Sequence, residues 1–232
     1  MTVFRLLALV LMFFAGGAWS MGITPFVHTF GPKKPSIQYT LNNPGESPMA
    51  FEVCVFKRGV GPDGKETNVK DTKTFTVFPL QVIVPAKSAR NIMLRYVGKP
   101  TNVEEAFRVA FEQFPLPTGE EKAKRGATLA IKLRILASLY MKPDGAEPRF
   151  EIVSVKKTTK EGEEAYAVRV RNVGNAHGEV GTVEQEVTVF GKKLPLNKAL
   201  GESGGSTVVL AQTEVDVFVT QKSMEPKKEK KS

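Results

Sequence analysis

The chain has 232 residues, of which 41% are apolar and 25% charged, and this composition excludes a chain that is disordered throughout. The length suits one large domain or two domains of about 100 residues. The formal net charge of +9 favours acidic partners or anionic surfaces.

Residues 1–20 have the pattern of a secretory signal peptide. Arg5 precedes an apolar run, and the small residues Ala18 and Ser20 flank Trp19 as they do before a cleavage site. The apolar run is short for a transmembrane helix, although an uncleaved N-terminal anchor remains the alternative. We therefore expect a secreted protein that begins near Met21.

The segment from residue 21 to residue 143 alternates apolar and polar residues in short runs, which is typical of β-strands. Turn residues separate the runs. Residues 58–72 are rich in Gly, Asp and Lys, and we predict an exposed hairpin loop there. Residues 118–126 predict a second polar loop, and only residues 102–107 suggest a brief helical turn.

A change in the sequence pattern at residues 143–148 predicts a domain boundary. Shorter strands and Gly-rich turns follow it. We predict an all-β fold with two immunoglobulin-like β-sandwich domains joined by a short hinge. The first domain would span residues 21–143 and the second, smaller one residues 148–221. The lysine-rich residues 222–232 predict a disordered tail.

Motifs for chemistry are missing from the sequence. There is no phosphate-binding loop, no dinucleotide fingerprint and no nucleophile elbow. The two histidines, His28 and His177, are too far apart in sequence for a metal motif, and the single Cys54 fits a buried strand residue. We predict no enzyme activity, no metal or other cofactor, no nucleic acid and no small-molecule substrate.

The run "LAIKLRILASLYMKP", residues 129–143, predicts one long strand. Its apolar residues share one face: Leu129, Ile131, Leu133 and Ile135. Lys132 and Arg134 lie on the opposite face. Two interpretations stay open, because the apolar face either packs in the domain's own core or is kept for a partner.

Four segments in this order resemble periplasmic chaperones of the chaperone–usher pilus pathway. They are "YTLNNPGESPMAFEV" (39–53), "FTVFPLQVIVPAKSARNIMLRY" (75–96), "NVEEAFRVAFEQFPLP" (102–117) and the run at 129–143. The resemblance covers residues 23–143 and is much poorer beyond residue 148. It implies a periplasmic protein whose partners are pilus or fimbrial subunits and an outer-membrane usher.

The resemblance also implies a role for the run at 129–143. In this family the last strand of the first domain is donated to a subunit that lacks one, and its apolar side chains fill the subunit's groove. The alignment puts Leu129, Ile131 and Leu133 on the inserted positions, with Ile135 next on the same face. An unpaired strand edge beside an apolar groove would otherwise aggregate.

Two sets of charged residues follow from the resemblance. The family holds the subunit's C-terminal carboxylate with two cations, but Val27 and Ser138 stand at those positions here. Arg134 and Arg171 are our candidates for the missing anchor. The family also has a buried interdomain ion pair, and the aligned residues are Arg95 and Glu104.

Two other functions compete with the chaperone hypothesis. One is a secreted immunoglobulin-like structural or adhesin module that retains all its own strands. The other is a carbohydrate-binding or enzyme-accessory module. The only tryptophan, Trp19, lies in the signal segment, which disfavours sugar binding by aromatic stacking.

Overall fold

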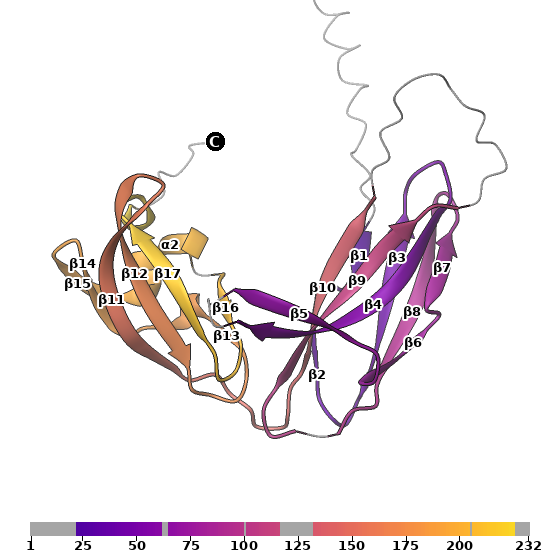
Figure 1. The fold of residues 1–232 in the computed structure, drawn as a ribbon, viewed down its shortest axis with the longest axis horizontal. Coiled ribbons are helices and arrows are strands. Elements are labelled where there is room, and N and C mark those ends of the chain that lie inside the picture. The colour runs from indigo at the N-terminus through magenta and orange to yellow at the C-terminus, as the bar shows by residue number, and fades with distance from the viewer. Residues whose placement is uncertain (1–21, 62–64, 100, 117–131, 205, 226–232) are drawn as a thin grey trace, which may run out of the picture.

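The computed structural model describes residues 22–61, 65–99, 101–116, 132–204 and 206–225. Two β-rich lobes lie side by side and form a V, with the first domain on the right in Figure 1. The all-β prediction is confirmed, since strands make up most of both lobes. In this part of the chain no helix is long and apolar enough to span a membrane.

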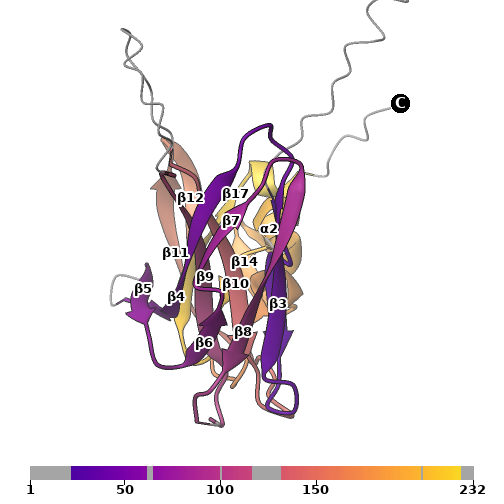
Figure 2. The ribbon, with the colours of Figure 1, turned by 90° about the vertical axis from the view of Figure 1, so that its right-hand side faces the viewer.

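The first domain is a sandwich of two sheets. One sheet has the order β1 (Gly22–Thr24), β3 (Ser36–Asn43), β8 (Ser88–Tyr96), β6 (Phe75–Phe78). The other has the order β2 (Val27–Phe30), β10 (Arg134–Met141), β9 (Glu105–Phe114), β4 (Met49–Val60), β5 (Glu66–Asp71), and β7 (Gln81–Val84) also pairs with β4. Figure 2 shows the molecule from the side of this lobe, whose strands lie in front of the second domain.

Alternating apolar residues from both sheets fill the first core. Tyr39, Leu41, Phe107 and Phe111 are fully buried there. These side chains point inward because successive residues of a strand face opposite sides of its sheet. The sequence alternation therefore fixes which face of each strand is covered.

The second domain is built around a three-stranded sheet, β11 (Phe150–Lys160), β12 (Glu163–Asn172) and β17 (Glu214–Thr220). Two small two-stranded sheets accompany it: β13 (Gly178–Glu179) with β16 (Val208–Val209), and the hairpin of β14 (Glu186–Val189) with β15 (Lys192–Pro195). Helical turns η2 (Val180–Thr182) and η3 (Lys222–Met224) and the helix α2 (Leu196–Gly204) complete it. Its core is separate from the first one and rich in valine.

Four local predictions need correction. Most described residues of 58–72 are strand and not loop, because β4 runs to Val60 and β5 spans Glu66–Asp71. Residues 102–107 contain no helical turn, and α2 was not anticipated. The predicted tail starts too early, since Ser223 in η3 donates a hydrogen bond to the carbonyl of Ala199. The signal segment 1–20 and the loop 118–126 lie outside the described residues.

The β4–β5 hairpin extends beyond the first sandwich toward the second domain (Figure 1). Val60 at the end of β4 packs against Val208 and Leu210 of the second domain. Ala106 and Tyr140 join this small apolar cluster from β9 and β10. The hairpin therefore forms one wall of the cleft between the domains.

Candidate functional site

The strand β10 has one edge that is only half covered. Ser138–Met141 pair in parallel with β2 on one side and antiparallel with β9 on the other. Arg134–Ala137 pair with β9 alone among the described strands. The first half of β10 is therefore an open edge beside a sheet.

Hydrogen bonds show which backbone groups face this open edge. The N–H of Ser138 points away from β9 and donates to the carbonyl of Phe26 at 2.8 Å. The carbonyl of Leu133 points toward β9 and accepts from the N–H of Gln113 at 2.9 Å. Because backbone groups alternate along a strand, Arg134 and Leu136 present their N–H and C=O groups at the open edge.

The structure describes two of the four predicted donor residues. Ile135 is 9% exposed and belongs to the first domain's own core. For this residue, the interpretation that the apolar face packs in the domain's own core is the correct one. Leu133 is partly buried and packs at the margin of this core. Leu129 and Ile131 lie outside the described residues. Among the described residues, the apolar face of the run is thus buried at Ile135 and partly buried at Leu133.

The outer face of the same sheet looks into the interdomain cleft. Arg134 forms an ion pair with Glu112 at 2.9 Å, and its guanidinium lies 5.4 Å from the ring centre of Phe56. The Arg134 side chain is 52% exposed, so this is a surface pair. Leu136, two residues further along β10, is an exposed apolar residue on this face.

Val27 and Ser138, which the alignment places at the family's two cation positions, are direct partners in the β2–β10 ladder. Arg108 on β9 pairs with Ser138 from the other side. Its guanidinium donates a hydrogen bond to the Ser138 hydroxyl. A cation therefore lies beside this position after all, although it comes from a neighbouring strand.

Glu66 on β5 connects Arg108 with a second arginine, Arg58 on β4. The Glu66 carboxylate accepts from Arg108 Nε at 2.9 Å and from Arg108 Nη2 at 2.8 Å. It also accepts from Arg58 Nε at 2.6 Å and from Asn68 Nδ2 at 3.1 Å. Both carboxylate oxygens are therefore saturated with donors.

The ionised form of Glu66 is stabilised by its neighbours. Burial raises its pKa, but hydrogen bonds from Arg108 and Asn68 and the charge of Arg58 outweigh burial and lower the pKa from 4.5 to about 2. The carboxylate is consequently ionised at neutral pH. The group of Arg58, Arg108 and Glu66, which we call the two-arginine site, then carries a net charge of +1.

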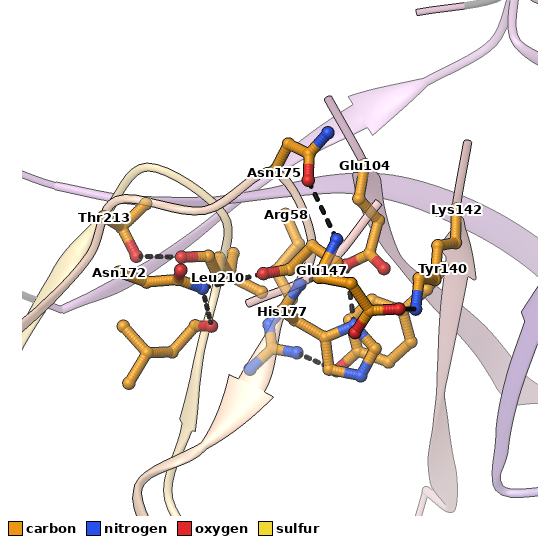
Figure 3. Close-up of polar contacts among 12 residues, drawn as sticks. Arg58, Glu104, Tyr140, Lys142, Glu147, Asn172, Asn175, His177, Leu210 and Thr213 are labelled. Atoms are coloured by element: carbon orange, nitrogen blue, oxygen red, sulfur yellow. Dashed lines mark hydrogen bonds and ion pairs between the residues drawn. The ribbon is translucent and has the colours of Figure 1, made fainter. Parts of the chain in front are cut away.

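The two-arginine site borders the second domain. Arg58 donates to the phenol oxygen of Tyr140 at 2.7 Å (Figure 3). Arg58 and Glu66 line a cavity of about 140 Å³ whose opposite wall includes Leu210 and Glu214. Arg171, our second candidate anchor, is paired with this Glu214. It therefore lies across the cleft and is also occupied by an acid.

The predicted interdomain pair of Arg95 and Glu104 is wrong. Arg95 alternates with the buried Leu94 and Tyr96 on β8, so its side chain points outward from the first sandwich. Glu104 instead contacts His177 of the second domain, with 2.6 Å between Oε1 and Nδ1 (Figure 3). The Glu104 side chain is only 1% exposed.

The hinge around Glu104 is tightly connected. The His177 ring stacks on Tyr140 with 3.8 Å between ring centroids. The backbone N–H of His177 donates to Glu104 Oε1 at 3.0 Å. The Glu104 N–H donates to the carbonyl of Asn175 at 2.9 Å. An acid from the first domain and an imidazole from the second therefore help to fix the angle between the domains.

Comparison with known proteins assigns this architecture. The family model described as "Pili and flagellar-assembly chaperone, PapD N-terminal domain" matches residues 23–147, and the chain belongs to this family. A chaperone role in pilus assembly follows from this membership. No curated protein sequence matches the chain.

Solved structures agree on the fold. The CsuC–CsuE chaperone–tip adhesion subunit pre-assembly complex from archaic chaperone-usher Csu pili of Acinetobacter baumannii matches with a TM-score of 0.57 and 15% identity, covering 88% of each chain. The class 5 fimbriae chaperone CfaA matches with a TM-score of 0.56 and 16% identity, covering 85% of each chain. The E. coli chaperone DraB matches with a TM-score of 0.52 and 12% identity, covering 88% of this chain and 86% of its own.

Proposed function

We propose that this protein captures incomplete pilus subunits by lending them β10. The observation that carries the proposal is the open edge at Arg134–Ala137, where β9 is the only described strand that pairs with β10. A subunit strand docked there gains main-chain hydrogen bonds from Arg134 and Leu136. Complexes of related chaperones with a tip subunit and with the Salmonella pilin SafA support a subunit as the partner.

Apolar side chains supply the second part of the binding energy. We propose that Leu129, Ile131 and Leu133 enter the subunit's groove, while Ile135 stays in the chaperone's own core. Full burial of a Leu or Ile side chain contributes about 1.5–3 kcal/mol. The cost of ordering the strand and the subunit reduces the net affinity below the sum of these contributions.

We further propose Arg108 as the anchor for a subunit's C-terminal carboxylate, in preference to Arg134 and Arg171. Arg108 lies beside Ser138, the aligned anchor position, and is more buried than either alternative. A partly buried cation binds a carboxylate more strongly than an exposed one, because water screens it less. Arg134 and Arg171 remain useful comparison variants.

The proposal includes a cellular setting. A cleaved signal peptide would deliver the chain to the periplasm, where it would pass its subunits to an outer-membrane usher. No catalysis and no cofactor are needed, because the donated strand itself completes the subunit's core. Family membership supports this setting.

Proline at position 136 tests the open edge. Leu136→Pro removes one N–H group from the open edge and leaves the β9 ladder intact, and edge positions tolerate proline. We expect the variant to fold and to bind a co-expressed pilus subunit about tenfold more weakly, the loss of roughly one hydrogen bond with its strain. Co-purification and thermal unfolding measure the two effects.

Ala137→Pro is the matched control. The N–H of Ala137 points toward β9, so proline there breaks a central ladder and should destabilise the free protein. Normal subunit binding by a folded Leu136→Pro variant would rule out pairing at this edge.

A further inference from the structure

The two-arginine site is preorganised by contacts that do not involve Glu66. Arg108 is fixed by the Ser138 hydroxyl and Arg58 by the Tyr140 phenol. Both partner residues belong to β10, the strand proposed for donation. The two guanidinium groups therefore keep their places in the cleft whether or not a carboxylate lies between them.

Burial sets this site apart from the other ion pairs of the surface. The side chains of Arg58, Arg108 and Glu66 are 10%, 23% and 32% exposed. The bidentate pair of Arg169 and Asp216 has similar geometry but is much more exposed on the second domain. A carboxylate gains more from two partly desolvated guanidinium groups than from one solvated group.

Glu66 itself stands on a weakly held element. Among the described strands β5 pairs only with β4, and the pair of Val60 with Glu66 lies next to the hairpin turn. Most side chains of β5 are exposed, and Glu66 is its first residue. Moving the Glu66 carboxylate away therefore requires only rotation of a side chain that stands on an exposed edge hairpin.

We infer that Glu66 is an internal competitor, which fills the two-arginine site in the free protein and gives way to the terminal carboxylate of a bound subunit. This inference rests on the proposed function and adds a regulated state to it. The empty chaperone keeps its arginines paired and thereby rejects stray anions. A subunit gains the site only when strand pairing along β10 holds its carboxylate nearby at high effective concentration.

Acetate is the simplest probe, because it offers a carboxylate without a strand. We would titrate acetate into the ¹⁵N-labelled protein and follow the arginine side-chain N–H signals by NMR. In Glu66→Gln the Arg108 signal should shift and saturate, with an affinity at least about tenfold higher than in the wild type. Glu66→Asp, which keeps the charge on a shorter side chain, should fall between the two.

Glu112→Gln is the matched control, since it frees Arg134 on the same face of the same sheet. We expect no saturating acetate response at Arg134 and a wild-type response at Arg108. Equal acetate affinity in wild type, Glu66→Gln and Glu66→Asp would overturn the inference and leave Glu66 as a clamp between strands. If Glu66→Gln does not fold, the comparison of Glu66→Asp with wild type decides alone.

A second arm separates this inference from the proposed function. Binding of a pilus subunit with a free C-terminus should tighten in Glu66→Gln by about tenfold, and binding of the same subunit with an amidated C-terminus should not change. If Glu66→Gln bound acetate tightly but the protein captured no subunit, strand donation would be contradicted, and the role of Glu66 as a competitor for the two-arginine site would stand. If Glu66→Gln captured the subunit with unchanged affinity, the role of Glu66 as a competitor would be contradicted, and strand donation would stand.

Discussion

Replacing Ile131 by Asp should abolish capture of a pilus subunit and leave the thermal unfolding of the free chaperone unchanged. Ile135→Asp, four residues later in the same alternating run, should instead destabilise or unfold the free chaperone. Ile135 is buried in the chaperone's core, so a carboxylate there costs about 4 kcal/mol or more, a large part of the stability of a domain. A substitution outside a core typically changes stability by about 0.5 kcal/mol or less.

The two variants form a matched pair because the residue type is the same and the sequence alternation predicts the same face of one strand for both. Co-purification with a subunit reports capture, and calorimetry of the free protein reports folding. If Ile131→Asp unfolded the chaperone as Ile135→Asp does, the whole run would belong to the chaperone's own core. The adhesin-like alternative, in which the chain keeps all its strands, would then gain support.

Arg108→Ala should weaken binding of a subunit with a free C-terminus by about 10- to 100-fold, which corresponds to roughly 1.4–2.8 kcal/mol. The reason is that a carboxylate in the cleft loses its bidentate partner and keeps only Arg58. Binding of an amidated subunit should change little. Titrations of both subunit forms against the wild type and the variant provide the measurement.

Arg134→Ala serves as the comparison. Its guanidinium is half exposed and already paired with Glu112, so we expect at most about a twofold effect. A larger and carboxylate-dependent loss in Arg134→Ala than in Arg108→Ala would restore Arg134 as the anchor. If Arg108→Ala weakened binding of the free and the amidated subunit equally, the subunit's carboxylate would not be the group that binds Arg108.

Local alternation made the strands predictable. Ile135 was expected on an apolar face of a strand, and it lies in the first core. The segment of β5 escaped prediction because its side chains are nearly all polar and it is exposed on an edge. Its strand conformation comes from pairing with β4, which no local pattern in residues 58–72 records.

The residues of the candidate site are brought together by strand register, which pairs residues far apart in the sequence. Arg108 stands on β9 among Ala106, Ala110 and Glu112 on the same face, and only the pairing with Ser138 brings it to the anchor position. The pair of Arg95 and Glu104 failed for a related reason. The alignment matched residue types, but alternation on β8 turns Arg95 away from the cleft that Glu104 faces.

His177 illustrates what a pairing between domains adds. It was set aside because two distant histidines do not form a metal motif, and the structure brings it against Glu104 and Tyr140. The contact joins residues 73 positions apart in sequence. Only the angle between the domains, which neither sequence segment encodes alone, creates this environment.

Strand donation at the open edge of β10 is the central claim, and amide hydrogen exchange at Leu136 tests it most directly. The Leu136 N–H faces the open edge, whereas the Ala137 N–H is held by β9. We predict that the Leu136 amide exchanges fast in the free chaperone and at least about 100-fold more slowly in the subunit complex, with Ala137 slow in both. Unchanged, fast exchange of Leu136 in a stable subunit complex would contradict the account.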